Sequence, residues 1–390
     1  MALSKIDVAN MLTGATPVAN GGTALTSGFV NGKDPRPDAK PLIINGNMAV
    51  AQRGTSFTSP GDAEYTLDRF NTNKSHDGAV TITQETLSSG NAYTDGFKNA
   101  LKIDVTTADT SLGSSQRLLL VQKIEAQNLQ LLKFGTSNAK KMTLAFWVKA
   151  TKTGTNVVRM YAPDDDRSCS ISYTISSSNT WEHKVLNFPA DTTGVIDDDN
   201  GSGIDVGWGL SAGSGFTSGT LATTWASNTS ANDFVGQVNH LDSTSNNFHI
   251  TGVQLEVGEF SSTTLPPFQH EDFGDNLSRC CRYFFFTGDG SVYQHHGTGV
   301  EASSTAVYIN IPLPSILRSA PSVSKEDSMV AWDGNSENAV TGLGNTYYSA
   351  KGSIVNQAVT CSGGGIDDTA GITVYSNADS SSGFLIDAEL

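Results

Sequence analysis

The chain has 390 residues, of which 37% are hydrophobic and only 16% charged, and its formal net charge at pH 7 is −15. Such a surface repels phosphate backbones and anionic membranes, which argues against nucleic-acid binding. No run of about 18 apolar residues occurs, so we expect no membrane insertion. The length suggests two or three domains at roughly 100 to 200 residues each.

Residues 1–40 are predicted to form an extended arm and linker without a core of their own. Met1 to Asp7 lack the basic-then-apolar build of a signal peptide, so we expect assembly in a cytoplasm. The turn-rich Asn20-Gly21-Gly22 requires positive φ angles, and Pro35 and Pro37 stiffen the chain that follows. An arm this polar and short needs a partner surface to stay ordered.

Residues 41–270 are predicted to form one β-sandwich. Ala100 to Val105 alternates between apolar and polar residues, and Met142 to Lys149 is the strongest predicted strand. Its period of two places Met142, Leu144, Phe146 and Val148 on one face. Turn clusters rich in Gly, Asn, Asp and Ser separate this strand from others at short spacing, which is typical of a sandwich or jelly roll.

Residues 271–390 are predicted to form a second, smaller β domain at the tip of the molecule. Leu277 to Phe286 joins a helix-like turn to an aromatic strand. Val307 to Ile311 and Ile372 to Tyr375 alternate as strands, and Phe384 to Leu390 ends the chain as another. The sequence therefore predicts a mainly β protein with an arm, a sandwich and a C-terminal β-rich domain.

A series of segments, in this order, resembles tail-fibre or appendage proteins of tailed bacteriophages that contain a jelly-roll domain like that of carbohydrate-binding modules. The segments are Asn45–Gly54, Tyr65–Phe70, Thr143–Ala150, Ile250–Gly258, Pro266–Gln269, Arg279–Phe284 and Ile386–Leu390. The resemblance implies a virion location and a homotrimer, and it supplies no catalytic residues. A further stretch is similar to N-terminal regions of phage tail fibres and implies that residues 1–40 anchor the chain to other tail or virion proteins: Val18, Ala19, Asn20, Gly21, Gly22 and Thr23.

Aromatic side chains near turns are the candidate residues for binding a host cell-surface glycan. A sugar ring offers a CH-rich face and a rim of hydroxyls, which suits an aromatic ring beside polar groups. Trp147 and Trp181 lie on predicted strands and are interpreted as packing residues. The candidates are Trp208, Trp225, Tyr293, His295, His296, Trp332, Tyr347 and Tyr348.

A cluster of carboxylates offers oxygen ligands of the kind that Ca²⁺ prefers. The candidates are Asp197, Asp199 and Asp205. Their spacing does not match an EF-hand loop, so a solvated, charged turn is the alternative interpretation. No other cofactor is expected.

Catalytic motifs are missing from the sequence. It contains neither a GxSxG nor an HExxH pattern. We therefore expect a non-enzymatic attachment protein that binds glycans through many weak sites. Two alternatives stay open: a purely structural head-decoration or tail-joining protein without a ligand, and a polysaccharide-cleaving appendage. Burial of Trp208, Trp225, Trp332 and Tyr347 together would favour the purely structural role.

Overall fold

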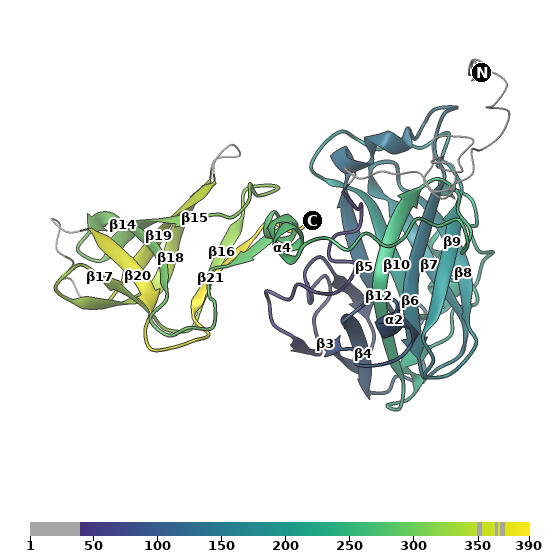
Figure 1. Ribbon diagram of the computed structural model, residues 1–390, viewed down its shortest axis with the longest axis horizontal. Coiled ribbons are helices and arrows are strands. Elements are labelled where there is room, and N and C mark those ends of the chain that lie inside the picture. The colour runs from purple at the N-terminus through teal and green to yellow at the C-terminus, as the bar shows by residue number, and fades with distance from the viewer. Residues whose placement is uncertain (1–39, 349–352, 363–365, 367–370) are drawn as a thin grey trace, which may run out of the picture.

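The computed structural model describes residues 40–348, 353–362, 366 and 371–390. They form two β bodies joined by a narrow neck, with the larger body in purple to green and the smaller in green to yellow (Figure 1). The predicted fold class, a mainly β protein with a jelly-roll-like sandwich and a second smaller β domain, is confirmed. The predicted N-terminal anchoring arm, with Val18 to Thr23, lies outside the described residues. Among those described, no helix is both long enough and apolar enough to cross a membrane.

The larger body is a sandwich of two six-stranded antiparallel sheets. In order across the first sheet, the strands are β1 (Ser56–Thr58), β3 (Ala79–Thr86), β4 (Asn99–Thr107), β12 (Asn247–Val257), β6 (Met142–Ala150) and β9 (Glu182–Phe188). The second sheet contains β11 (Ala226–Ser227), β8 (Arg167–Ile175), β7 (Gly154–Ala162), β10 (Ser202–Ala212), β5 (Arg117–Glu125) and β2 (Asn71–Ser75). Short helical turns join them: α2 (Asn91–Thr94), α3 (Ser214–Thr217), η2 (Ala126–Leu132), η3 (Pro163–Asp165), η4 (Ser230–Asn232) and η5 (His240–Asp242).

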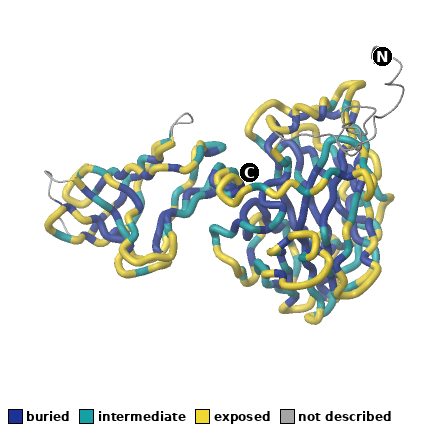
Figure 2. Tube along the Cα trace, viewed as in Figure 1, coloured by how far each residue is buried: buried dark blue, intermediate teal, exposed yellow. Residues whose placement is uncertain are grey.

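The alternation along β6 shows why these residues form a strand with two different faces. Met142, Leu144, Phe146 and Val148 are fully buried between the two sheets, as predicted. Trp147 points to the other face, where its Nε1 donates a hydrogen bond to Oδ2 of Asp95 at 3.1 Å. Buried strands run through the whole sandwich under exposed turns (Figure 2). The core therefore comes from the inward residues of both sheets.

The smaller body is a closed antiparallel barrel. Around the barrel, the strands are β14 (His295–Ser303), β15 (Ala306–Pro312), β19 (Ile354–Cys361), β18 (Glu337–Tyr348), β17 (Met329–Trp332) and β20 (Ile372–Ser376). Closure leaves none of these strands at an open edge. Val307, Ile309 and Ile311 fill the interior, so the residues between them, Tyr308 and Asn310, point outward. The outer face of the barrel is thus set by the alternate residues of each strand.

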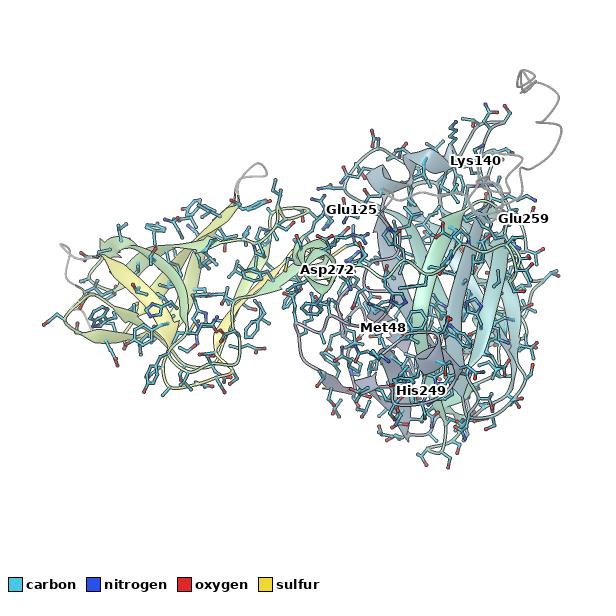
Figure 3. All side chains as sticks on the ribbon, in the orientation of Figure 1. Met48, Glu125, Lys140, His249, Glu259 and Asp272 are labelled. Carbon is cyan, nitrogen blue, oxygen red and sulfur yellow. The ribbon has the colours of Figure 1, made fainter. Side chains whose placement is uncertain are left out.

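The neck combines a helix with a small sheet. Helix α4 (Phe273–Cys281) begins after Asp272, whose Oδ1 accepts a hydrogen bond from the Gly274 N–H at 2.8 Å. β21 (Gly383–Asp387) lies between β13 (Phe284–Phe286) and β16 (Ser322–Glu326) in a three-stranded sheet. Asp272 and Glu125 are labelled on the two sides of the junction (Figure 3). Arg282 donates to both carboxylate oxygens of Glu125, at 2.7 and 2.8 Å, which ties the neck to the sandwich.

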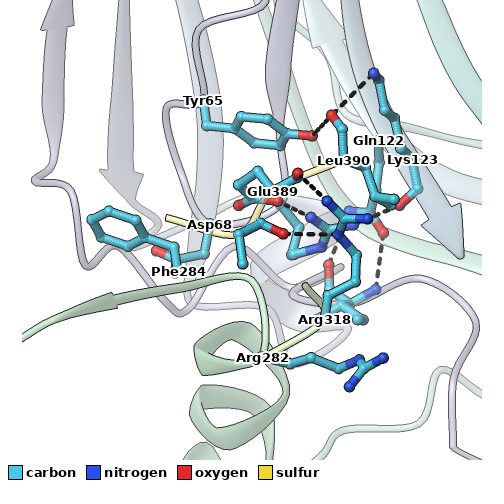
Figure 4. A network of polar contacts seen from close by, with 12 residues as sticks. Tyr65, Asp68, Gln122, Lys123, Arg282, Phe284, Arg318, Glu389 and Leu390 are labelled. Atoms are coloured by element: carbon cyan, nitrogen blue, oxygen red, sulfur yellow. Dashed lines mark hydrogen bonds and ion pairs between the residues drawn. The ribbon is translucent and has the colours of Figure 1, made fainter. Parts of the chain in front are cut away.

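A buried polar network holds the last residues of the chain against the sandwich (Figure 4). Nη1 of Arg69 pairs with the Glu389 carboxylate, and both side chains are at most 5% exposed. The other Glu389 oxygen lies 3.3 Å from Arg53. Tyr65 Oη donates to the carbonyl oxygen of Leu390 at 3.1 Å. The barrel is therefore connected to the sandwich twice, through α4 and through the returning strand β21.

The buried His240 is expected to make the stability of the sandwich decrease at acidic pH. Burial lowers the pKa of this histidine from 6.5 to about 4, and its Nε2 hydrogen-bonds to Oδ1 of Asn156 at 2.7 Å. Above pH 6.5 the imidazole ring is neutral in both the folded and the unfolded protein. Between pH 6.5 and pH 4 the ring becomes protonated in the unfolded chain but stays neutral in the folded one, so protonation favours unfolding. We expect about 3 kcal/mol of stability to be lost between pH 6.5 and pH 4 from this group alone.

Denaturant unfolding at a series of pH values tests that expectation. His240→Asn should flatten the dependence between pH 6.5 and 4, while His270→Gln, a change at an exposed histidine, should leave it unchanged. An identical pH dependence in the wild type and His240→Asn would show that His240 contributes nothing to it.

Candidate functional site

Two of the predicted glycan-binding tryptophans belong to the sandwich core. Trp208 is fully buried on β10 and packs edge-on against the Phe146 ring, with centroids 5.9 Å apart. Trp225 is 8% exposed, and its Nε1 donates to the carbonyl oxygen of Pro189 at 2.9 Å. The prediction that either binds a ligand is wrong. The neighbouring Gly209 permits close packing, since a Cβ there would lie 2.8 Å from the Phe234 ring.

Two further candidates, His296 and Tyr348, have hydrogen-bond partners within the barrel domain. His296 is 3% exposed and is held between Oγ1 of Thr287 and Oγ of Ser376, each at 2.9 Å. Burial lowers its pKa, so the ring is neutral at physiological pH. Tyr348 is half-buried, and its hydroxyl donates to the carbonyl oxygen of Leu317 at 3.1 Å. The prediction that His296 binds a ligand is wrong, because the ring is buried and both of its nitrogens have internal partners. The prediction for Tyr348 stays a prediction, since its side chain is only half-buried.

The other predicted residues lie on the outside of the barrel, and three of them gather on one face. His295 pairs with Tyr375 across β14 and β20, and their ring centroids are 5.6 Å apart. Tyr293, 56% exposed, lies 6.4 Å from the same Tyr375 ring. Trp332, 44% exposed, is paired on one side with Thr373 of β20 and on the other with Glu337 of β18. We call this group of residues the Glu337 face; it comprises Tyr293, His295, Tyr375, Trp332 and Glu337.

The carboxylate of this face accepts a hydrogen bond from a neighbouring ring. Tyr375 Oη donates to Oε1 of Glu337 at 2.6 Å, and this hydrogen bond raises the pKa of Tyr375 to about 12. Beneath them Val330, paired with Tyr375, is only 3% exposed. One Glu337 oxygen is thus engaged, and the other can accept a hydrogen bond from a ligand hydroxyl. Exposed aromatic rings around a carboxylate are the groups that a sugar needs.

A tight turn brings Trp332 and Glu337 opposite each other. Oδ1 of Asp333 accepts hydrogen bonds from the N–H groups of Asn335 and Ser336, at 2.9 and 2.7 Å. This capped turn closes the β17–β18 hairpin. The sequence analysis missed Tyr375 and Glu337. The alternation along Ile372–Tyr375 was the signal that could have placed Tyr375 on the outer side of its strand.

Tyr347 does not join the Glu337 face. It is 52% exposed at the other end of β18 and pairs with Asn356 of β19. A purely structural role would be favoured if Trp208, Trp225, Trp332 and Tyr347 were all buried. Trp208 and Trp225 are buried, whereas Trp332 and Tyr347 are exposed. The condition that would favour a purely structural protein is not met.

The acidic candidates do not form the predicted calcium site. Oδ1 of Asp199 accepts from the Gly201 N–H at 2.7 Å, and Asp205 accepts from Ser202 Oγ. Within residues 40–348 and the described parts of 353–390, no group of three or more His, Cys, Asp and Glu side chains could hold a metal ion. Asp197 and Asp199 belong to a turn and Asp205 to β10, so the solvated-turn interpretation fits the first two.

A cavity of about 1100 Å³ opens at the neck, between the sandwich and α4. Each of the four cations in its described lining has a partner: Arg282 pairs with Glu125, Arg279 with Glu271, Lys123 with the Leu390 carbonyl and Lys40 with Asp275. Among the described residues that line it, Tyr283 is the one aromatic residue, and it is 1% exposed. The cavity therefore lacks an aromatic surface for a sugar, and the Glu337 face remains the better candidate.

Comparison with family models and with curated proteins finds no match for this chain. Among solved structures, it is similar to the enzymatically active domain of tailspike protein 4 of bacteriophage CBA120, at 14% identity and a TM-score of 0.29. That similarity covers 56% of this chain and only 21% of the tailspike chain. A family 11 carbohydrate-binding module from Clostridium thermocellum, solved with a β-1,3-1,4-mixed-linked tetrasaccharide, is 13% identical over 55% of this chain and 99% of its own, with a TM-score of 0.26. Similarities this low identify neither a ligand nor a family for the chain.

Proposed function

We propose that this chain is an attachment protein of a tailed-bacteriophage virion that binds host cell-surface glycans through the Glu337 face and catalyses no reaction. The observation that carries the proposal is that Tyr375 lies beside the rings of Tyr293 and His295 and donates a hydrogen bond to Glu337. Glu337 in turn pairs with Trp332 across β17 and β18 on the outside of the barrel. The ordered segments that resemble phage appendage proteins support the virion location. Residues 1–40 would anchor the chain to other virion proteins.

The chemistry of the face suits weak, repeated binding. Aromatic rings stack on the CH-rich side of a sugar, and Glu337 accepts hydrogen bonds from its hydroxyls. A site with a dissociation constant near 1 mM contributes about 4 kcal/mol. In a homotrimer, which has closed cyclic symmetry, three copies would engage one surface. Linked sites of this kind raise the overall affinity by about 10² to 10⁴.

The surroundings of Glu337 favour binding over hydrolysis. A glycosidase of the common kind needs two carboxylates that flank the scissile bond. The nearest carboxylate in sequence, Asp333, is 2% exposed, and its oxygens accept hydrogen bonds from the turn that it caps. Glu337 itself is tied to Tyr375. Neither residue is arranged as a general acid beside a nucleophile.

Substitution of two rings tests the proposal. We expect Trp332→Ala/Tyr375→Ala to lower binding of the full-length chain to an array of immobilised bacterial surface polysaccharides by at least about 10-fold, a loss of roughly 1.4 kcal/mol or more. The matched control is Leu131→Ala, a comparably exposed apolar residue of the sandwich, which should bind as the wild type does. Equal binding by the double variant and the wild type would contradict the proposed site. Release of oligosaccharides from the array would show that the protein is catalytic.

A further inference from the structure

A second aromatic surface lies on the barrel, away from the Glu337 face. It is formed by Tyr308 and Asn310 of β15, Tyr347 of β18 and Asn356 of β19, and we call it the Tyr347 face. Asn356 is paired both with Asn310 and with Tyr347, so the three side chains point to the same side of the sheet. Tyr347 lies ten residues beyond Glu337 on β18, roughly 30 Å along an extended strand.

The Tyr347 face combines two rings with two amides. The centroids of Tyr308 and Tyr347 are 6.2 Å apart, with their planes inclined at 59°. Nδ2 of Asn356 donates to Oδ1 of Asn310 at 3.1 Å. An amide pair that shares one hydrogen bond keeps further donor and acceptor capacity on both members. The face therefore offers stacking surfaces beside groups that bind hydroxyls in either direction.

Exposed apolar residues extend this surface. Val300 of β14 is 61% exposed and pairs with Tyr308, and Ile354 of β19 is 48% exposed. These residues do not contribute to the closed interior of the barrel, which is filled by the alternate positions of the same strands. A surface that presents rings and aliphatic groups to solvent in this way is typical of an interaction site.

The lack of basic residues on the barrel strands favours uncharged ligands over acidic ones. None of the six strands contains a lysine or an arginine, and their only carboxylates are Glu301 and Glu337. A phosphate, uronate or sialate group bound here would have no strand cation to pair with, and the net charge of −15 repels it. An uncharged sugar ring needs no cation on these strands.

We propose that the Tyr347 face is a second binding site for uncharged glycans, so that each barrel carries two sites of different polar chemistry. The inference rests on the proposed function, since it takes the barrel to be the glycan-binding part of the chain. A carboxylate serves the first site, and an amide pair serves the second. Two sites on one rigid body raise the effective concentration of a repeating polysaccharide without any new contact.

Calorimetric titration of the full-length chain tests the number and the kind of the sites. The probes are neutral gluco-, galacto- and manno-oligosaccharides, with oligogalacturonate and oligosialate as acidic counterparts. We expect a neutral probe to bind twice per chain, and Tyr308→Ala/Tyr347→Ala and Trp332→Ala/Tyr375→Ala each to reduce this to once. On an immobilised neutral polysaccharide, either double variant should lose at least about 10-fold in apparent affinity. Tyr347→Phe, which keeps the ring, should retain two sites.

Several outcomes would overturn the second site and leave the proposed function standing. In the first, the Tyr308→Ala/Tyr347→Ala variant binds the neutral probe with the stoichiometry and affinity of the wild type, while the Trp332→Ala/Tyr375→Ala variant loses binding. Another is binding of the acidic probes alone. A third is a shift of the Tyr308→Ala/Tyr347→Ala variant to a smaller species in sedimentation with its binding intact, which would make the face a subunit interface. Absence of binding to every probe by the wild type would instead remove both the proposed function and this site.

Discussion

Arg69→Ala is expected to lower the free energy of unfolding by about 3 to 5 kcal/mol, because it leaves a buried carboxylate without its main partner. Arg69 is 1% exposed in its side chain and pairs with Glu389, which is 5% exposed. Its guanidinium also lies 3.4 Å from the centroid of the Tyr283 ring and donates to the Lys123 carbonyl at 2.7 Å. One side chain thus connects the sandwich, the neck and the last residues of the chain.

Scanning calorimetry and denaturant unfolding of the full-length chain measure this loss. Lys141→Ala is the matched control, since Lys141 pairs with Glu259 at 2.7 Å but both side chains are at least half exposed. A pair of that kind is worth at most about 1 kcal/mol. Arg69→Lys should recover only part of the stability, because an ammonium lacks the planar fork that reaches two acceptors.

A double-mutant cycle separates the pair from its surroundings. Arg69→Ala/Glu389→Gln should lose clearly less than the sum of the two single changes, since the second substitution removes the stranded charge. Strict additivity, or a loss for Arg69→Ala no larger than that of Lys141→Ala, would show that the buried pair does not hold the neck.

The sandwich was predictable from the sequence because its signal is local. Period-two alternation assigned Met142, Leu144, Phe146 and Val148 to one face, and the structure buries all four. The same rule places Tyr308 and Tyr375 on the outer side of their strands. Which outward residues meet around a closed barrel depends on strand order, and the pairing of β20 with both β14 and β17 cannot be read from either segment alone.

The failed ligand predictions share one cause. Trp208 lies between two glycines and Trp225 follows two threonines, and such neighbours are also typical of exposed turns. In β10, Gly209 instead leaves room for the Phe234 ring to pack against the strand. His296 is the second residue of the barrel strand β14, where it points inward to Ser376. Local composition does not report on which side of a sheet a residue lies.

The segments that carry the family resemblance meet one another in space. The Gly46 carbonyl accepts from the Val253 N–H at 2.9 Å, which joins the first resembling segment to the fourth. Gln52 donates to Asp68 and to the Phe284 carbonyl, at 2.6 and 2.9 Å. Arg69 then pairs with Glu389 of the last segment. Several of these motifs therefore meet at the junction of sandwich and neck, while the candidate glycan faces lie on the barrel, outside the motifs.

Trp208→Ala is expected to destabilise the sandwich by about 3 to 5 kcal/mol while leaving glycan binding by the folded protein unchanged. Trp208 is among the largest fully buried side chains, and it fills the space between Phe70 and Phe146, with ring centroids 6.4 and 5.9 Å away. Its removal leaves a cavity that strands from both sheets cannot close. Denaturant unfolding at 25 °C measures the loss.

Trp332→Ala is the paired control for Trp208→Ala and should behave in the opposite way. Its ring is 44% exposed, so the stability should change by no more than about 0.5 kcal/mol. Its binding to the polysaccharide array should fall, whereas Trp208→Ala should bind normally at a temperature where it is folded. If Trp208→Ala instead unfolded like the wild type but lost glycan binding, the tryptophan would be a ligand contact, and the proposal that places glycan binding on the barrel would be wrong.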